Sequence, residues 1–332
     1  MDPIPLLRAS QLRPLATCLE SAGIPVERAL MAARIPVHAL EHPSWLVPEA
    51  AVWQLMENVA RDDGFEDIGL AAGAAGRLSD IGRLGERIES AYTLHDALQT
   101  FIESIGGHSS LCAYWLEFRR DDVLFCRTGT EGLKSGSWPA EQYVISLMIQ
   151  IVRLAAGSHW CPREVYLHSA RTSGVERFDA LSLADIRTSA SCTAIAISLD
   201  HLGSRMRSQA APSTEDSGRM PITVDFVQSL RAAVRSYLPE GYPGILLAAE
   251  IAGTSVRTLQ RQLLEAHTSY SRLVDHVRHE AALETLAQSN ARVIDVAYDL
   301  GYADPASFTR AFRRWAGVSP SAFRARHGFG GM

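Results

Sequence analysis

The chain has 332 residues, which is enough for roughly two domains of ordinary size. Hydrophobic residues make up 47% of the sequence and charged residues 21%, so a mostly disordered chain is excluded. The formal net charge of −5 does not by itself indicate a nucleic-acid partner. No apolar run reaches the ~18 residues of a transmembrane helix, and no signal peptide is visible. We therefore expect a cytoplasmic protein with no membrane partner.

The first 202 residues predict an α+β domain. Helical patterns cover residues 6–23, 26–35, 48–62 and 81–105, the last with Thr93 as a cap. Further on, two strands joined by a polar turn, a long apolar helix and two short strands are expected, at residues 111–118, 123–127, 139–156, 164–168 and 193–199. Residues 69–76 are rich in Gly and Ala but lack the Gly-Lys-Ser/Thr ending of a phosphate loop, which favours helix packing or a turn.

The five cysteines predict reduced thiols rather than a metal site or a disulfide framework. They lie far apart and form no C-x-x-C motif: Cys18, Cys112, Cys126, Cys161 and Cys192. The sequence also lacks a zinc-protease motif and a G-x-S-x-G motif. We expect no metal, no cofactor and no enzymatic activity.

Residues 203–221 (GSRMRSQAAPSTEDSGRMP) are polar and rich in Ser, Gly and Pro, which predicts an interdomain linker. The charge changes sign near this point. Residues 226–332 hold 12 arginines and 9 acidic residues, a net charge of +3, whereas residues 1–225 carry −8. Helical patterns then continue to the C-terminus. The expected organisation is an N-terminal domain over 1–202, a linker over 203–221 and an all-α domain over 222–332.

The all-α region contains an internal repeat with a spacing of 48–49 residues, at 249–263 and 297–312. Each copy reads as a short helix, a glycine suited to positive φ, a polar cap and a second amphipathic helix. Ser255 is the expected cap in the first copy. Asp304, followed by Pro305 at the first helical position, is the expected cap in the second. The repeat therefore predicts two helix-turn-helix units.

A helical wheel divides the second helix of each copy into two faces. The expected inward residues are Val256, Leu259, Leu263 and Ala266 in the first copy and Phe308, Phe312 and Trp315 in the second. The expected outward residues are Arg257, Gln260 and Arg261, and then Ala306, Thr309, Arg310, Arg313 and Arg314. For either helix alone, a solvated charged face is the plainer interpretation. Two matched copies favour DNA binding, since a helix in the major groove needs long donors and little bulk.

At residues 299–324 (DLGYADPASFTRAFRRWAGVSPSAFR) the chain resembles the AraC/XylS family of bacterial transcription regulators, and at 255–261 (SVRTLQR) it resembles that family's first helix-turn-helix. The resemblance covers about 226–327. It implies a seven-helix domain in which a long helix near 271–288 joins the two units, whose recognition helices enter successive major grooves. Carried over by position, the expected DNA contacts are Arg257, Gln260, Arg261, Pro305, Ala306, Thr309 and Arg310. Because Pro305 and Ala306 lack side-chain donors, the second helix is expected to read shape, phosphate or thymine methyls more than base hydrogen bonds.

The N-terminal region resembles, less closely, the arabinose-binding-type domain of one branch of this family, at residues 47–48, 67–70 and 92–98. That resemblance implies a small effector and dimerisation, without implying arabinose itself. Candidate effector-binding residues are Tyr114, Trp115, Trp138 and Tyr143, although core packing is the plainer interpretation of each.

These features together predict a sequence-specific DNA-binding transcription regulator. The resemblance implies an activator that forms a homodimer. Its expected partners are promoter or operator DNA, RNA polymerase and a small-molecule effector, and it is nucleoid-associated when bound to DNA. Two alternatives stay open: an N-terminal domain that serves only dimerisation or protein-partner binding, and a sensor or scaffold in which DNA binding is incidental.

Overall fold

The computed structural model describes residues 3–78, 83–105, 113–128, 136–206, 225–241, 243–288 and 291–327. The chain divides into two compact units. The N-terminal unit comprises Pro5–Ser44 and Pro48–Ile222, and the C-terminal unit comprises Met1–Ile4, Trp45–Val47 and Thr223–Met332. Within the C-terminal unit, the Ile4 backbone N–H donates to the Ser229 hydroxyl at 2.8 Å. Among the described residues, no helix is long and apolar enough to cross a membrane.

Helices form the first half of the N-terminal unit: α1 (Leu12–Ser21), α2 (Val26–Ala32), α3 (Glu49–Asp62), α4 (Ile68–Ala75), α5 (Arg83–Glu89) and α6 (Leu94–Ile105). The helix expected from residue 6 starts only at Leu12, because Leu6–Arg8 is the short strand β1; a second short strand, β2, spans Leu46–Pro48. Leu6 and Leu7 are both buried, which an extended segment achieves because successive side chains point in opposite directions.

The predicted cap at Thr93 is confirmed. The Asp96 backbone N–H donates to the Thr93 hydroxyl at 3.2 Å, and the Thr93 backbone N–H donates back to the Asp96 carboxylate at 3.1 Å. This reciprocal pair is a capping box, and it starts α6. The region expected to be helical over 81–105 is accordingly two helices, α5 and α6, with the capped break between them.

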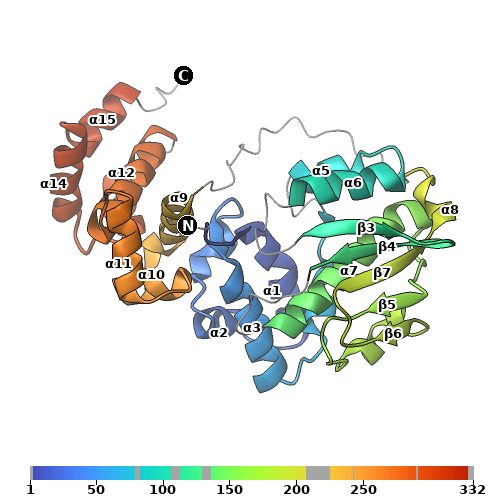
Figure 1. Ribbon diagram of the computed structural model, residues 1–332. Helices are drawn as coiled ribbons and strands as arrows, with labels where there is room; N and C mark the ends of the chain where they lie inside the picture. The colour runs from blue at the N-terminus through green and yellow to red at the C-terminus, as the bar shows by residue number, and fades with distance from the viewer. Residues whose placement is uncertain are drawn as a thin grey trace. The chain divides into compact units, whose positions relative to one another are not determined.

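The second half of the N-terminal unit is a five-stranded sheet in the order β3-β4-β7-β5-β6 (Figure 1). Its strands are β3 (Tyr114–Phe118), β4 (Asp122–Arg127), β5 (Glu164–Tyr166), β6 (Asp185–Arg187) and β7 (Thr193–Ser198), and the short helix α8 (Leu199–Leu202) follows. The predicted hairpin is confirmed, since β3 and β4 pair antiparallel with Leu116 opposite Phe125. Strand β6 pairs parallel with β5 at the sheet edge. It was not predicted, since two of its three residues are charged.

One face of the sheet builds the main core with helices α6 and α7 (Ser137–Ala156). Phe125 and Ile195 on this face are fully buried together with Phe101 of α6. The other face carries a smaller buried cluster of Leu124, Cys126, Ala194 and Ala196. Because β4 and β7 have apolar residues on both faces, their sequences read as continuous apolar runs.

Helix α7 also carries a buried carboxylate. Glu141 is 2% exposed, and its two oxygens accept from the backbone N–H groups of His168 at 2.7 Å and Ser169 at 3.1 Å. The Thr193 hydroxyl donates to the same carboxylate. A buried charge is tolerated when several donors surround it. Glu141 thereby ties the residues after β5 and the start of β7 to α7.

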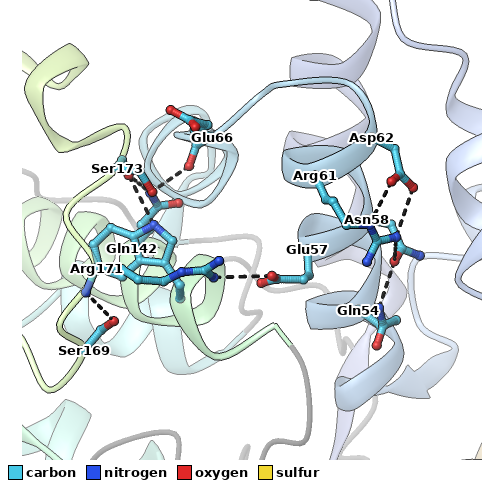
Figure 2. A network of polar contacts seen from close by, with 11 residues as sticks. Gln54, Glu57, Asn58, Arg61, Asp62, Glu66, Gln142, Ser169, Arg171 and Ser173 are labelled. Atoms are coloured by element: carbon cyan, nitrogen blue, oxygen red, sulfur yellow. Dashed lines mark hydrogen bonds and ion pairs between the residues drawn. The ribbon is translucent and has the colours of Figure 1, made fainter.

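The small residues of α4 allow it to lie very close to α7, so of the two outcomes that the Gly/Ala pattern favoured, helix packing or a turn, the structure has helix packing. A Cβ atom placed on Gly69 would be 2.2 Å from the Pro139 carbonyl oxygen, and one on Gly73 would be 2.6 Å from the Ser146 Cβ. The buried Gln142 amide adds polar contacts and donates to the carbonyls of Glu66 and Ser173 at 2.9 and 3.1 Å (Figure 2).

Residues 204–206, expected at the start of the linker, pack against the N-terminal unit. The Leu94 backbone N–H donates to the Ser204 carbonyl, the Met206 N–H donates to the Tyr92 carbonyl, and Met206 is buried. Residues 207–224, which hold most of the expected linker, lie outside the described residues.

The described part of the C-terminal unit contains seven α-helices, as the family resemblance implied. They are α9 (Phe226–Tyr237), α10 (Ile245–Ile251), α11 (Val256–Glu265), α12 (Tyr270–Gln288), α13 (Val293–Asp299), α14 (Pro305–Ala316) and α15 (Pro320–His327). The long helix expected near 271–288 is α12.

Candidate nucleic-acid interface

The first helix-turn-helix consists of α10 and α11, and its turn follows the predicted chemistry. Gly253 has φ of +63°, a conformation that residues with a Cβ rarely adopt. The Ser255 hydroxyl accepts from the Thr258 backbone N–H at 3.2 Å, which caps α11. The sequence therefore specifies both the end of α10 and the start of α11 through local interactions.

The second helix-turn-helix consists of α13 and α14 and uses a stronger cap. Gly301 in the turn has φ of +71°. One oxygen of the Asp304 carboxylate accepts from the Ser307 backbone N–H at 2.8 Å, and Pro305 occupies the first turn of α14. Hydrogen bonds from Ser307 lower the pKa of the Asp304 carboxyl, so this residue is ionised at neutral pH. A negative charge at a helix N-terminus also interacts favourably with the helix dipole.

The two recognition helices bury different kinds of side chain on their inner faces. Leu259 and Leu263 anchor α11, whereas Phe308 and Phe312 anchor α14, with ring centroids 5.8 Å apart. Trp315 is half-buried, and its ring lies 5.4 Å from that of His279 on α12. The inward position predicted for Ala266 is wrong. Helix α11 ends at Glu265, so the helical wheel no longer applies at Ala266, which is exposed.

On α11, the three residues expected to contact DNA are all exposed: Arg257, Gln260 and Arg261. Arg261 interacts weakly with Glu265, with 3.9 Å between Nε and Oε1 and both side chains more than half exposed. Such a surface pair contributes little to stability, so the guanidinium can leave it at small cost. This face presents two cations and one amide to solvent.

On α14, Ala306 and Arg310 are exposed, while Pro305 and Thr309 are half-buried. The Thr309 hydroxyl donates to the Pro305 carbonyl at 2.9 Å. Its proton is therefore used within the helix, which leaves its methyl group and its oxygen lone pairs for a ligand. Among these four expected contact residues, Arg310 is the one with long side-chain donors.

Arg310 forms a hydrogen bond that the sequence pattern did not predict. Its Nη2 donates to the Ser307 hydroxyl at 2.8 Å, and that hydroxyl donates to the Asp304 Oδ2 at 2.6 Å. The three residues follow one another at intervals of three, so they share one side of α14. The i,i+3 spacing was the signal in the sequence that could have identified Ser307.

Arg278 and Arg314 are among the arginines of the C-terminal unit that protein contacts hold. Arg278 of α12 donates to the carbonyls of Leu300 and Gly301, both at 3.0 Å, and its guanidinium lies 4.5 Å from the Tyr302 ring centroid. Arg314 donates to Asp275 of α12 at 3.0 Å. Arg278 thus connects the turn of the second helix-turn-helix to the central helix α12. Arg314, an expected outward residue, also links α14 to that helix.

Three of the four candidate effector residues of the N-terminal unit, Tyr114, Trp138 and Tyr143, lie in or against the main core, and Trp115 does not. Tyr114 packs edge-on against Phe101, with ring centroids 4.8 Å apart, whereas its strand neighbour Trp115 points to the other face of the sheet and is 36% exposed. Trp138 is buried and donates to the Ser173 carbonyl, and Tyr143 lies against Trp53 with centroids 5.7 Å apart. The last two are on α7.

Solved structures that align with this chain include the following two. The transcriptional regulator CdpR from Pseudomonas aeruginosa aligns over 95% of this chain and 98% of its own, with 22% sequence identity and a TM-score of 0.43. A DNA-binding transcriptional dual regulator from Escherichia coli K-12 aligns over 30% of this chain and 91% of its own, with 25% identity and a TM-score of 0.27.

Two relatives found by sequence comparison are named as regulators. The Ornithine utilization regulator of Pseudomonas aeruginosa is 36% identical over 105 residues, which is 31% of this chain and 31% of that protein. The HTH-type transcriptional regulator VirS of Mycobacterium tuberculosis is 28% identical over 141 residues, or 40% of this chain and 42% of that protein. The chain thus spans less than half of the length of these relatives, 31% of the first and 42% of the second.

Two family descriptions cover most of the chain. Residues 248–326 match a helix-turn-helix domain. Residues 23–206, more than half of the chain, match the arabinose-binding domain of AraC transcription regulators. The first match includes α11, α12, α13 and α14, and the second includes the five-stranded sheet. The chain therefore belongs to the AraC family of DNA-binding transcription regulators.

Proposed function

We propose that this regulator is a sequence-specific transcription activator whose DNA contacts are made by the exposed faces of α11 and α14. The contacts would be Arg257, Gln260 and Arg261 in the first unit and Pro305, Ala306, Thr309 and Arg310 in the second. The observation that carries this proposal is the matched construction of the two helices. Each has a capped N-terminus, a buried inner face and an exposed arginine six residues after its cap, at Arg261 and Arg310.

An exposed guanidinium near the N-terminal half of a groove-entering helix can donate two hydrogen bonds to guanine. Arg261→Ala in the full chain should therefore cost about 1–3 kcal/mol at the specific site and relax base preference at one position. The site is first identified by selection from a random duplex library and then mapped by footprinting.

Arg235→Ala is the matched control for the loss of one cation. Arg235 lies in the same unit on α9, where it pairs with Glu284. This variant should bind the selected site nearly as well as the unaltered chain. Unchanged affinity and base preference in Arg261→Ala would remove Arg261 from the DNA contacts.

The N-terminal unit is proposed to bind a small effector and to dimerise. Support comes from its match to the arabinose-binding domain of AraC regulators, a description that does not fix the ligand. The name of the Ornithine utilization regulator makes amino acids the first group of compounds to test. A bound effector that shifts the DNA-binding equilibrium in the usual allosteric range would change affinity by roughly 5- to 150-fold.

The second candidate function is dimerisation without a ligand. Thermal unfolding and DNA affinity of the full chain, measured across a panel of metabolites, separate the two. A raised melting temperature and altered DNA affinity with one compound support the effector. Sedimentation showing a dimer, with no response to any compound, supports the alternative. Transcription in vitro with purified RNA polymerase decides between activation and repression.

A further inference from the structure

We propose that Ser307 is a positioning residue for DNA recognition: anchored on Asp304, its hydroxyl holds the Arg310 guanidinium in place to read a guanine. This inference rests on the proposed role of α14 as a DNA-contacting helix. It assigns base reading to the second helix through a single arginine. It thereby revises the expectation, drawn from Pro305 and Ala306, that this helix reads mainly shape and phosphates.

The direction of each hydrogen bond in this group follows from the number of available protons. The Ser307 hydroxyl has one proton, and it is donated to Asp304 Oδ2 at 2.6 Å. The lone pairs of the same oxygen then accept from Arg310 Nη2 at 2.8 Å. The other Asp304 oxygen accepts from the Ser307 backbone N–H at 2.8 Å. The carboxylate therefore fixes both the backbone and the hydroxyl of Ser307.

Holding one nitrogen leaves most of the guanidinium available. Arginine has five N–H donors, and the bond to Ser307 uses one of those on Nη2. The Nε and Nη1 donors and the second Nη2 proton remain, so a two-donor edge that includes Nη2 stays available, and the exposed position of Arg310 gives it access to solvent. A guanine presents two acceptors, O6 and N7, in the major groove, which suit a pair of arginine donors. Neighbouring Ala306 is small and exposed, so it leaves room for close approach.

The first helix-turn-helix provides an internal comparison. Ser255, Thr258 and Arg261 occupy the positions equivalent to Asp304, Ser307 and Arg310. The hydroxyls of Ser255 and Thr258 lie 2.9 Å apart, so the contact equivalent to Asp304–Ser307 is present. The contact equivalent to Ser307–Arg310 is replaced, because Arg261 pairs with Glu265, one turn further toward the C-terminal end of α11. Arg310 is thus held toward the N-terminus of its helix, and Arg261 is not.

The physical consequence is a difference in preorganisation. A long side chain that must be fixed upon binding costs about 0.5–1.5 kcal/mol, a penalty that a preexisting hydrogen bond reduces. Removing the Ser307 hydroxyl should therefore weaken guanine preference at one position of the second half of the site. Since a tenfold change in affinity corresponds to ~1.4 kcal/mol, the expected loss is between about twofold and tenfold.

The test is selection of binding sites from a random duplex library by the full-length protein, followed by affinity measurements on matched duplexes that differ at one base pair. Four variants are compared with the unaltered chain: Ser307→Ala, Ser307→Thr, Arg310→Ala and Thr258→Ala. Ser307→Ala keeps the backbone N–H that caps α14, so its melting temperature should be close to that of the unaltered chain. Thr258→Ala makes the same kind of hydroxyl deletion in the first helix.

We expect Arg310→Ala to abolish the preference for guanine at one position and Ser307→Ala to reduce it at that same position. Ser307→Thr, which retains a hydroxyl, should keep the guanine preference of the unaltered chain. Thr258→Ala should leave the base preference read by Arg261 unchanged. If Ser307→Ala keeps the full preference while Arg310→Ala loses it, Ser307 has no positioning role. If Arg310→Ala also keeps it, Arg310 reads no base. If the unaltered chain selects no sequence, the proposed sequence-specific function itself fails.

Discussion

Replacing Gly69 by alanine tests whether the close packing of α4 on α7 holds the N-terminal unit together. The added Cβ would meet the Pro139 carbonyl oxygen at 2.2 Å and the Gln142 Cβ at 2.7 Å. The first of these atoms belongs to the backbone of α7, so it cannot rotate away as a flexible side chain would. The two helices must instead move apart by roughly 1 Å to restore normal van der Waals contact.

The net change in the free energy of unfolding of Gly69→Ala follows from three contributions. Overpacking of a tight interface costs about 1–3 kcal/mol. Separation of the helices also weakens the Gln142 hydrogen bonds to the Gly69 N–H and to the Glu66 carbonyl, for a further ~1 kcal/mol. The greater helix propensity of alanine offsets ~1 kcal/mol. We expect a net loss of about 2 kcal/mol, which lowers the melting temperature by roughly 4–8 °C in a unit of this size.

Gly76→Ala is the matched control, because Gly76 follows the same helix but has more space. Its nearest neighbours, the Ala72 carbonyl oxygen and the Pro14 Cγ, would lie 3.5 Å from the new Cβ. The backbone there is extended, so alanine fits without strain and should raise stability by ~0.5 kcal/mol. Thermal unfolding of both variants, followed by circular dichroism, makes the comparison. Equal melting temperatures would refute the steric role of Gly69.

Three further outcomes are expected. Burial is the main cause, and nearby Cys192 the second, of a pKa of about 12 for the Cys126 thiol. At pH 8 a thiol reagent should therefore label exposed Cys161, whereas Cys126 should react only after unfolding. Peptide mass spectrometry of the labelled protein makes this measurement. Burial is the main cause, and the charge of His276 the second, of a lowered pKa for the His279 imidazole. The folded state therefore favours neutral His279, and the stability that this residue contributes is full above pH ~6.5 and is lost as the pH falls through the lowered pKa. The melting temperature of the C-terminal unit should decline with acid, less so in His279→Gln. Glu141→Gln should destabilise the N-terminal unit by about 1–3 kcal/mol in denaturant titrations, because an amide offers one acceptor oxygen where the carboxylate offers two; an unchanged midpoint would contradict this.

Local chemistry made most of the C-terminal unit predictable. A cap needs only a side-chain oxygen and an N–H group three residues later, and a turn glycine needs only its own freedom at positive φ. For this reason Ser255, Asp304 and Gly301 could be assigned from the sequence, and the buried faces of α11 and α14 followed from helical periodicity. The error at Ala266 arose where that periodicity stops, at the end of a helix.

The N-terminal unit was predictable in its elements but not in its assembly. The sequence by itself determined the hairpin of β3 and β4, the long helix α7 and the small-residue character of α4, since alternation and apolar periodicity are properties of short segments. Only the tertiary structure decided that β7 lies between β4 and β5, and that Glu141 receives its donors from residues more than 25 positions away. It likewise decided that Arg314 of α14 pairs with Asp275 of α12. Such contacts depend on which elements meet, and partners distant in the chain leave no periodic signal in the sequence.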